Sequence, residues 1–78
     1  MTQMRTFDYR GLKCPLPVLK ARRALAQLGV GEVVEILADD PASPLDMSHF
    51  CEAEGHVLAR SDLVESYFVY HIVKGALD

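Results

Sequence analysis

The chain has 78 residues, of which 50% are hydrophobic and 24% are charged, and its formal net charge is −3. This length and composition are typical of one small globular domain and exclude a disordered chain. Two cysteines are too few for a disulfide-rich secreted scaffold. No run of residues approaches the ~20 apolar positions of a membrane span, and the N-terminus does not resemble a signal peptide. We therefore expect a single cytoplasmic domain over residues 1–78 that does not bind membranes.

The basic residues gather near the N-terminus. Residues 1–23 contain six of the eight lysines and arginines and one acid, whereas residues 24–78 contain two bases and ten acids. Such a cluster is usually a solvated helix face, and it can also steer an acidic partner. We expect Lys13, Lys20 and Arg23 to contact a partner protein. Direct binding of nucleic acid is not expected, because phosphate binding depends on Lys and Arg and the chain is acidic overall.

The first half of the chain predicts a strand, a helix and a second strand. Residues 5–9 favour a short strand that carries Phe7 and Tyr9 on one face. Apolar positions recur at helical spacing over residues 15–28, and the glycines that follow end that helix. Residues 33–38 are rich in β-branched residues, which favours a strand.

The second half predicts a helix followed by a hairpin. Residues 43–46 are typical of a helix start, with Ser43 as the cap, a proline at the first position and an acid at the third, and Gly55 ends this helix. Residues 56–61 and 65–74 predict two strands joined by a turn at Asp62 and Leu63. The order β-α-β-α-β-β implies an α/β two-layer sandwich, with two helices on one face of a four-stranded mixed sheet. Its first crossover is expected to join parallel strands.

Cys14 lies on the predicted loop between the first strand and the first helix, at the carboxyl edge of the sheet, where α/β folds tend to place their chemistry. With Pro15 at the first helical position, Cys14 stands where a capping residue would, near the unpaired N–H groups of Leu16 and Val18. These donors and the helix dipole favour a thiolate, so we expect the pKa of Cys14 to lie below the free value of about 8.5. The alternative is a simple capped turn whose cysteine has no chemistry.

Structural interpretations are also open for the residues that flank Cys14 and for the second cysteine. Arg10 can place a positive charge near the sulfur or form a surface ion pair with Asp8. Gly11 permits a backbone angle or a close approach that a side chain would block. Cys51 lies on the apolar side of the second helix and is expected to be a buried structural thiol. No metal site is expected, because His49 and Cys51 point to different sides of that helix.

The N-terminal motif resembles the signature of the TusA/SirA-like sulfur carriers: Asp8-x-Arg10-Gly11-Leu12-x-Cys14-Pro15-x-Pro17. The resemblance covers nearly the full length and continues through weaker points: Gly31-Glu32, Asp39-Asp40-Pro41-Ala42, Asp46, Phe50-Cys51, Glu54-Gly55-His56 and Lys74-Gly75.

The resemblance implies a small α/β sandwich whose Cys14 carries sulfur as a persulfide, with no other cofactor. It also implies that six residues hold and frame the cysteine: Asp8, Arg10, Gly11, Leu12, Pro15 and Pro17. The implied partners are a cysteine desulfurase or rhodanese-type sulfur donor and a downstream sulfur-acceptor protein. A monomer is expected, since the carrier must visit both. The destinations known in the family are tRNA 2-thiouridine synthesis, sulfur oxidation, molybdenum-cofactor sulfur supply and selenium metabolism.

One departure from the family pattern affects the choice of destination. TusA proper has a threonine–arginine pair where this chain has Pro44-Leu45, which argues against the tRNA relay and leaves sulfur carriage intact. Two other functions stay open at this point. The layout also resembles the C-terminal domain of a translation initiation factor, which implies a non-catalytic RNA- or protein-binding module, and a single reactive cysteine can serve as a redox sensor.

Overall fold

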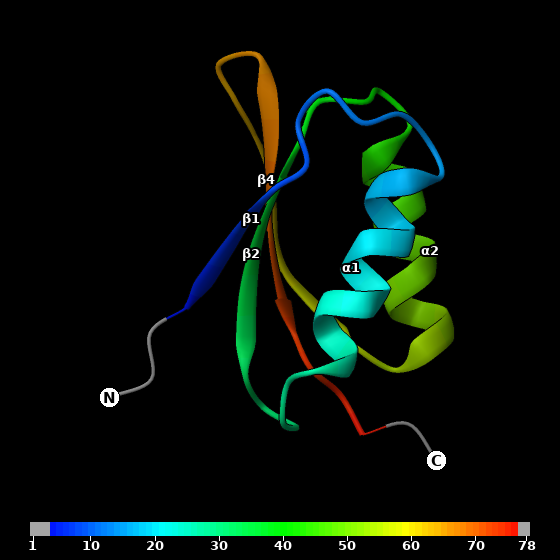
Figure 1. Cartoon of the computed structure of the whole chain (residues 1–78), viewed down its shortest axis with the longest axis vertical. Coiled ribbons are helices and arrows are strands. Elements are labelled where there is room, and N and C mark those ends of the chain that lie inside the picture. Colours follow the sequence, from blue (N-terminus) through cyan, green and yellow to red (C-terminus); the bar gives the residue numbers. More distant parts are fainter. Residues whose placement is uncertain (1–3, 77–78) are drawn as a thin grey trace.

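Two helices lie against one face of a four-stranded sheet in the computed structural model, which describes residues 4–76 (Figure 1). The elements in chain order are β1 (Arg5–Asp8), α1 (Leu16–Ala26), β2 (Val33–Ala38), α2 (Ser43–Glu54), β3 (Val57–Val64) and β4 (Tyr67–Val73). This order and layering confirm the predicted α/β two-layer sandwich. No helix in the described range is long and apolar enough to cross a membrane.

The sheet is mixed, and its strands stand in the order β1-β2-β4-β3. β1 pairs with β2 in parallel, as predicted for the first crossover, and β4 pairs antiparallel with both β2 and β3. Because β1 and β2 are parallel, the loops that leave them end at the same edge of the sheet. Both helices start from these loops, so their N-termini lie at one end of the molecule (Figure 1).

The core lies between the sheet and the helices because every second residue of the central strands faces that side. In β2, Val34, Ile36 and Ala38 are buried, while the residues between them are only partly buried. β4 continues the same layer, since Ile36 pairs with Tyr70. The helices close the core with buried side chains that include Ala21 and Leu25 of α1, and Met47 and Phe50 of α2.

Both helices start differently from the prediction. α1 begins at Leu16 and not at Pro15, and it ends at Ala26 because the last turn tightens into bonds to carbonyls three residues back. In α2, Ser43 is the first helical residue and not the cap, so that prediction is wrong. Its hydroxyl points into the core, where it forms a hydrogen bond of 2.7 Å with the hydroxyl of Tyr70. Gly55 ends α2 in the left-handed conformation, as predicted.

The turn of the C-terminal hairpin lies later in the chain than predicted. β3 runs through Asp62 and Leu63 to Val64, and the chain reverses at Glu65, which has a φ of 57°. β3 is an edge strand that is exposed along most of its length, and its register shifts between Leu58 and Arg60. An exposed edge and an irregular register remove the alternation of apolar and polar residues from which strand length is predicted.

The buried hydrogen bond between Ser43 and Tyr70 gives a test of how α2 is fixed to β4. Tyr70→Phe leaves the buried Ser43 hydroxyl without its partner, so we expect unfolding in urea to show a loss of about 1–3 kcal/mol. Adding Ser43→Ala removes both polar groups and should recover part of that loss. Strictly additive losses in the double variant would show that the two hydroxyls do not interact.

Candidate functional site

The β1–α1 loop exposes Cys14 at the end of the molecule where both helices begin. The cysteine opens on a groove between α1 and α2 with a volume of about 320 Å³, here called the Cys14 groove. Its walls are mostly apolar, and its polar members lie on the two helices. The residues that line it beside Cys14 are Pro15, Val18, Arg22, Asp46, His49, Phe50 and Ala53. An exposed thiol in an open groove is accessible to another protein.

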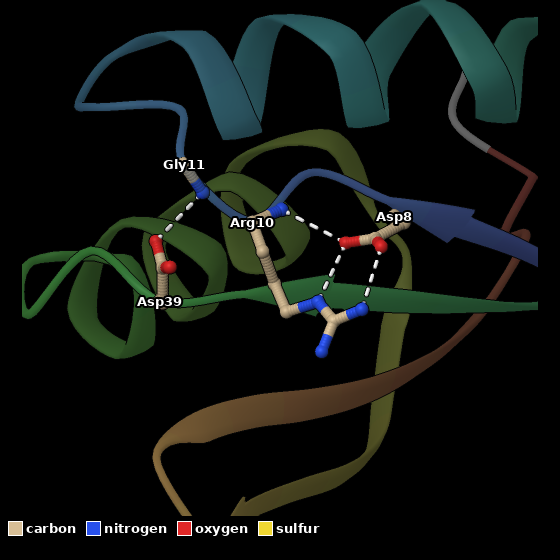
Figure 2. Close-up of polar contacts among 4 residues, drawn as sticks. All are labelled: Asp8, Arg10, Gly11 and Asp39. Atoms are coloured by element: carbon tan, nitrogen blue, oxygen red, sulfur yellow. Dashed lines mark hydrogen bonds and ion pairs between the residues drawn. The ribbon is translucent and has the colours of Figure 1, made fainter.

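Two carboxylates from the β2–α2 loop hold the β1–α1 loop in place. The side chain of Asp40 accepts hydrogen bonds from the backbone N–H of Cys14 and, at 3.0 Å, from that of Ala42. Asp39 accepts a bond of 2.9 Å from the backbone N–H of Gly11 (Figure 2). The two backbone bonds stabilise the charged form of Asp40 and lower its pKa. The position of the Cys14 backbone is therefore set by a loop distant in sequence.

Asp8 and Arg10 form the predicted surface ion pair. Arg10 donates from its side chain to both carboxylate oxygens of Asp8, at 2.9 and 2.8 Å, and from its backbone N–H at 3.1 Å (Figure 2). These bonds lower the pKa of Asp8 to about 2. The guanidinium also lies 4.8 Å from the centre of the Tyr67 ring on β4. Arg10 is thus directed toward Asp8 and Tyr67, and it is not among the residues that line the Cys14 groove.

The other residues expected to frame the cysteine shape the loop. Gly11 has a φ of 87°, and the space around its missing side chain is open, so the backbone angle and not a close approach requires glycine here. Leu12 is partly buried and donates its N–H to the carbonyl of Tyr9 at 3.2 Å. Pro15 is exposed beside Cys14 in the groove, whereas Pro17 is buried in the first turn of α1.

The three bases expected to contact a partner are exposed but do not form one patch around the cysteine. Lys13 precedes Cys14 on the loop. Lys20 and Arg23 line a separate hollow of about 160 Å³ on the side of α1 that faces β1, next to Tyr9. The base that α1 contributes to the Cys14 groove is Arg22, whose guanidinium forms an ion pair of 2.6 Å with Glu54.

The pKa of the Cys14 thiol is raised, so the prediction of a lowered pKa is wrong. The largest cause is a hydrogen bond to the carboxylate of Asp46, followed by partial desolvation and by the charges of Asp46 and Asp40. Cys14 is also not the capping residue: Pro15 flanks α1, and the N–H of Leu16 donates to the carbonyl of Lys13 at 2.8 Å. The carboxylates of Asp46 and Asp40 therefore disfavour the thiolate, whereas the N–H donors at the start of α1 were expected to favour it.

Cys51 lies in the core, as predicted, and its burial raises the pKa of its thiol to about 11. No cluster of three metal-ligating side chains occurs among residues 4–76.

Sequence reasoning missed the contribution of α2 to the groove. The sequence predicted Asp46 as part of a helix start, and it gave Asp46 and Phe50 as points of family resemblance. It predicted no metal site at His49. These residues and Ala53 follow one another at helical spacing, so they form one stripe of α2 facing the groove. That spacing was the available signal. That spacing does not identify the opposite wall of the groove, so the sequence alone does not place Asp46 in one groove with Cys14.

Comparison with known proteins identifies the family. The model of the family described as sulfurtransferase TusA matches residues 5–74. The chain belongs to this family. The TusA-family assignment agrees with a solved structure of similar fold, the crystal structure of a SirA-like protein from Desulfitobacterium hafniense. That structure is 34% identical, covers 94% of this chain and 100% of its own, and has a TM-score of 0.75.

Two curated relatives in Neisseria meningitidis, one from a serogroup A strain and one from a serogroup B strain, are each named "putative sulfur carrier protein". Each is 53% identical to this TusA-family chain over 53 residues, which span 68% of the chain and 72% of the relative.

The positive φ of Gly11 gives a test of how the loop is held. Gly11→Ala places an L-residue in the left-handed region, so we expect a loss of about 1–2 kcal/mol in unfolding free energy. D-Alanine at the same position, introduced by chemical synthesis, is the matched control. It adds the same methyl group in open space with the favoured handedness and should be at least as stable as glycine. Equal losses with both enantiomers would contradict the backbone explanation.

Proposed function

We propose that this protein is a sulfur carrier that holds sulfane sulfur as a persulfide on Cys14. Membership of the TusA family and the names of the Neisseria relatives support a carrier role. The observation that carries the assignment to Cys14 is its exposure in an open groove, while the other cysteine, Cys51, is buried in the core. A carrier needs a sulfur atom that two partners can reach in turn, and Cys14 meets that need.

The proposed reaction is an exchange at sulfur. The Cys14 sulfur attacks the outer sulfur of a donor persulfide, and the inner donor sulfur leaves as a thiolate. A cysteine of the acceptor then attacks the outer sulfur of the Cys14 persulfide in the same way. A cysteine desulfurase or a rhodanese-type protein is the proposed donor, and the acceptor is a second protein. The openness of the groove suits this chemistry, because each partner must bring its own cysteine to Cys14.

Exposed apolar side chains near the thiol form a surface for these partners. Leu16 and Leu19 of α1 and Leu45 of α2 are all exposed, and Leu16 and Leu45 lie in the first turns of their helices. Both first turns are at the end of the molecule that carries Cys14 (Figure 1). Exposed apolar residues grouped in this way are typical of protein–protein contacts. Lys13 adds positive charge next to the cysteine, which can steer an acidic partner.

Leu45 also bears on the destination of the sulfur. This residue is 63% exposed. By the resemblance described above, it stands where TusA proper has an arginine. An exposed leucine favours an acceptor with an apolar contact at this point and argues against the tRNA relay.

The proposal is tested by measuring the mass of the intact protein after incubation with cysteine and a cysteine desulfurase. The wild type and Cys51→Ala should each gain the mass of one sulfur atom, which a reducing agent should remove. Cys14→Ala should gain nothing, because Cys51 is buried and the pKa of its thiol is raised to about 11.

A wild type that gains no sulfur from the desulfurase or from a sulfane-sulfur donor would contradict the proposal. So would a gain that persists in Cys14→Ala. A salt-sensitive gel shift of RNA that is retained in Cys14→Ala would instead support the alternative function, a non-catalytic RNA-binding module.

A further inference from the structure

A second hollow, separate from the Cys14 groove, lies between α1 and the edge strand β1. We propose that it is a docking site for an extended acidic segment of a partner protein. Its volume is about 160 Å³, and it is here called the β1 hollow. The residues that line it are Phe7, Tyr9, Lys20, Arg23, Ala24 and Gln27. The inference rests on the proposed function in one respect, because the partner is one of the proteins with which Cys14 exchanges sulfur.

The α1 wall of the β1 hollow is one stripe along the helix. Its four residues follow at the spacing i, i+3, i+4 and i+7, so they lie on the same side of α1: Lys20, Arg23, Ala24 and Gln27. Ala24 is buried, whereas the other three are exposed. The two charged side chains are therefore available to a partner.

The opposite wall is aromatic and is fastened to the helix. Phe7 lies on β1 and Tyr9 directly follows this strand, and the centres of their rings are 5.9 Å apart. The hydroxyl of Tyr9 donates to the backbone carbonyl of Lys20 at 3.3 Å, which ties this wall to α1. Both aromatic side chains are only partly buried. They offer apolar surface to a partner beside the two positive charges.

The positive charge of the β1 hollow has no counter-charge within the protein. None of the ion pairs among residues 4–76 includes Lys20 or Arg23, whereas three other arginines in this range each pair with an acid. No acidic side chain from the same range lines the hollow. Two exposed cations without counter-ions, in a chain whose net charge is −3, favour a partner that is locally acidic.

The position of β1 favours an extended segment. β1 pairs with β2 on one side, and on its outer side it pairs with no other strand among residues 4–76. An extended peptide can bind such an edge through main-chain hydrogen bonds and direct alternate side chains toward the hollow. A nucleic acid cannot make these bonds, and two cations are few for a ligand whose affinity depends on many phosphate contacts.

The β1 hollow and the Cys14 groove can be occupied together. They share no lining residue, because α1 turns a different side toward each. Lys20 and Arg23 lie about 6 and 10 Å along the helix axis from Leu16, the first residue of α1. The loop that carries Cys14 ends at this same helix start. A partner bound in the β1 hollow can therefore reach Cys14 with its own cysteine.

The test follows the backbone amide signals of the isotope-labelled protein by NMR while hexaglutamate is added at low salt. The signals of residues that line the β1 hollow should shift and reach saturation. Lys20→Glu and Arg23→Glu should each weaken binding about fivefold, because attraction is replaced by repulsion. Added salt should weaken binding further, since both side chains are exposed. Arg60→Glu is the matched control, because it makes the same change of charge on β3, at the opposite edge of the sheet.

Shifts that do not saturate, or that persist unchanged in both Lys20→Glu and Arg23→Glu, would overturn the docking site. Tighter binding of hexauridylate than of hexaglutamate would overturn the choice of an acidic protein segment. Samples of the same wild type are also incubated with cysteine persulfide and their masses measured. A gain of sulfur without binding of hexaglutamate would overturn the docking site alone. Binding of hexaglutamate without any gain of sulfur would support the docking site and overturn the proposed function.

Discussion

The hydrogen bonds of the Asp40 carboxylate are the constraint on which the site depends. One oxygen holds the backbone of Cys14 and the other holds the start of α2, so two loops that are far apart in sequence are fixed against each other. The parallel pairing of β1 and β2 makes this possible, because it brings the ends of both strands to the same edge of the sheet. Asp39 adds a second tie through Gly11 (Figure 2). The thiol is consequently exposed while its backbone is held.

This geometry gives Cys14 a different character from that of a cysteine activated at a helix start. The sulfur is accessible, but the carboxylates of Asp46 and Asp40 contribute to raising the pKa of its thiol. A carrier has reason to differ from an enzyme with a permanently ionised cysteine, because it travels between partners and must avoid side reactions on the way. Accessibility and a suppressed charge together suit a sulfur atom that reacts when a partner docks.

Secondary structure was predicted best where buried and less buried residues alternate regularly along the chain. β2 was predicted with its observed bounds, since Val34, Ile36 and Ala38 alternate with less buried residues. The prediction failed at β3, whose exposed edge and shifted register carry no such alternation. Serine is a typical helix-capping residue, but the side chain of Ser43 forms a buried hydrogen bond with the hydroxyl of Tyr70 instead. The role of Ser43 therefore depends on a contact between α2 and β4, and such a contact cannot be predicted from the residues next to Ser43 in sequence.

The same limit applies to the candidate site. The motif around Cys14 identified the cysteine and its loop, and the family resemblance covered the chain. The rise in the pKa of the thiol could not be predicted, because its largest cause is Asp46, which lies on another helix. The sequence next to Cys14 indicated the prolines and the N–H groups at the start of α1, whereas the carboxylate of Asp46 comes from a separate element of the fold.

The most direct test is a pH titration of the Cys14 thiolate by its ultraviolet absorbance, in a Cys51→Ala variant with one cysteine. The account predicts a midpoint above that of free cysteine, about 8.5. A midpoint clearly below that value would contradict it, since the sulfur would then be stabilised as a thiolate despite the negative charges of Asp46 and Asp40.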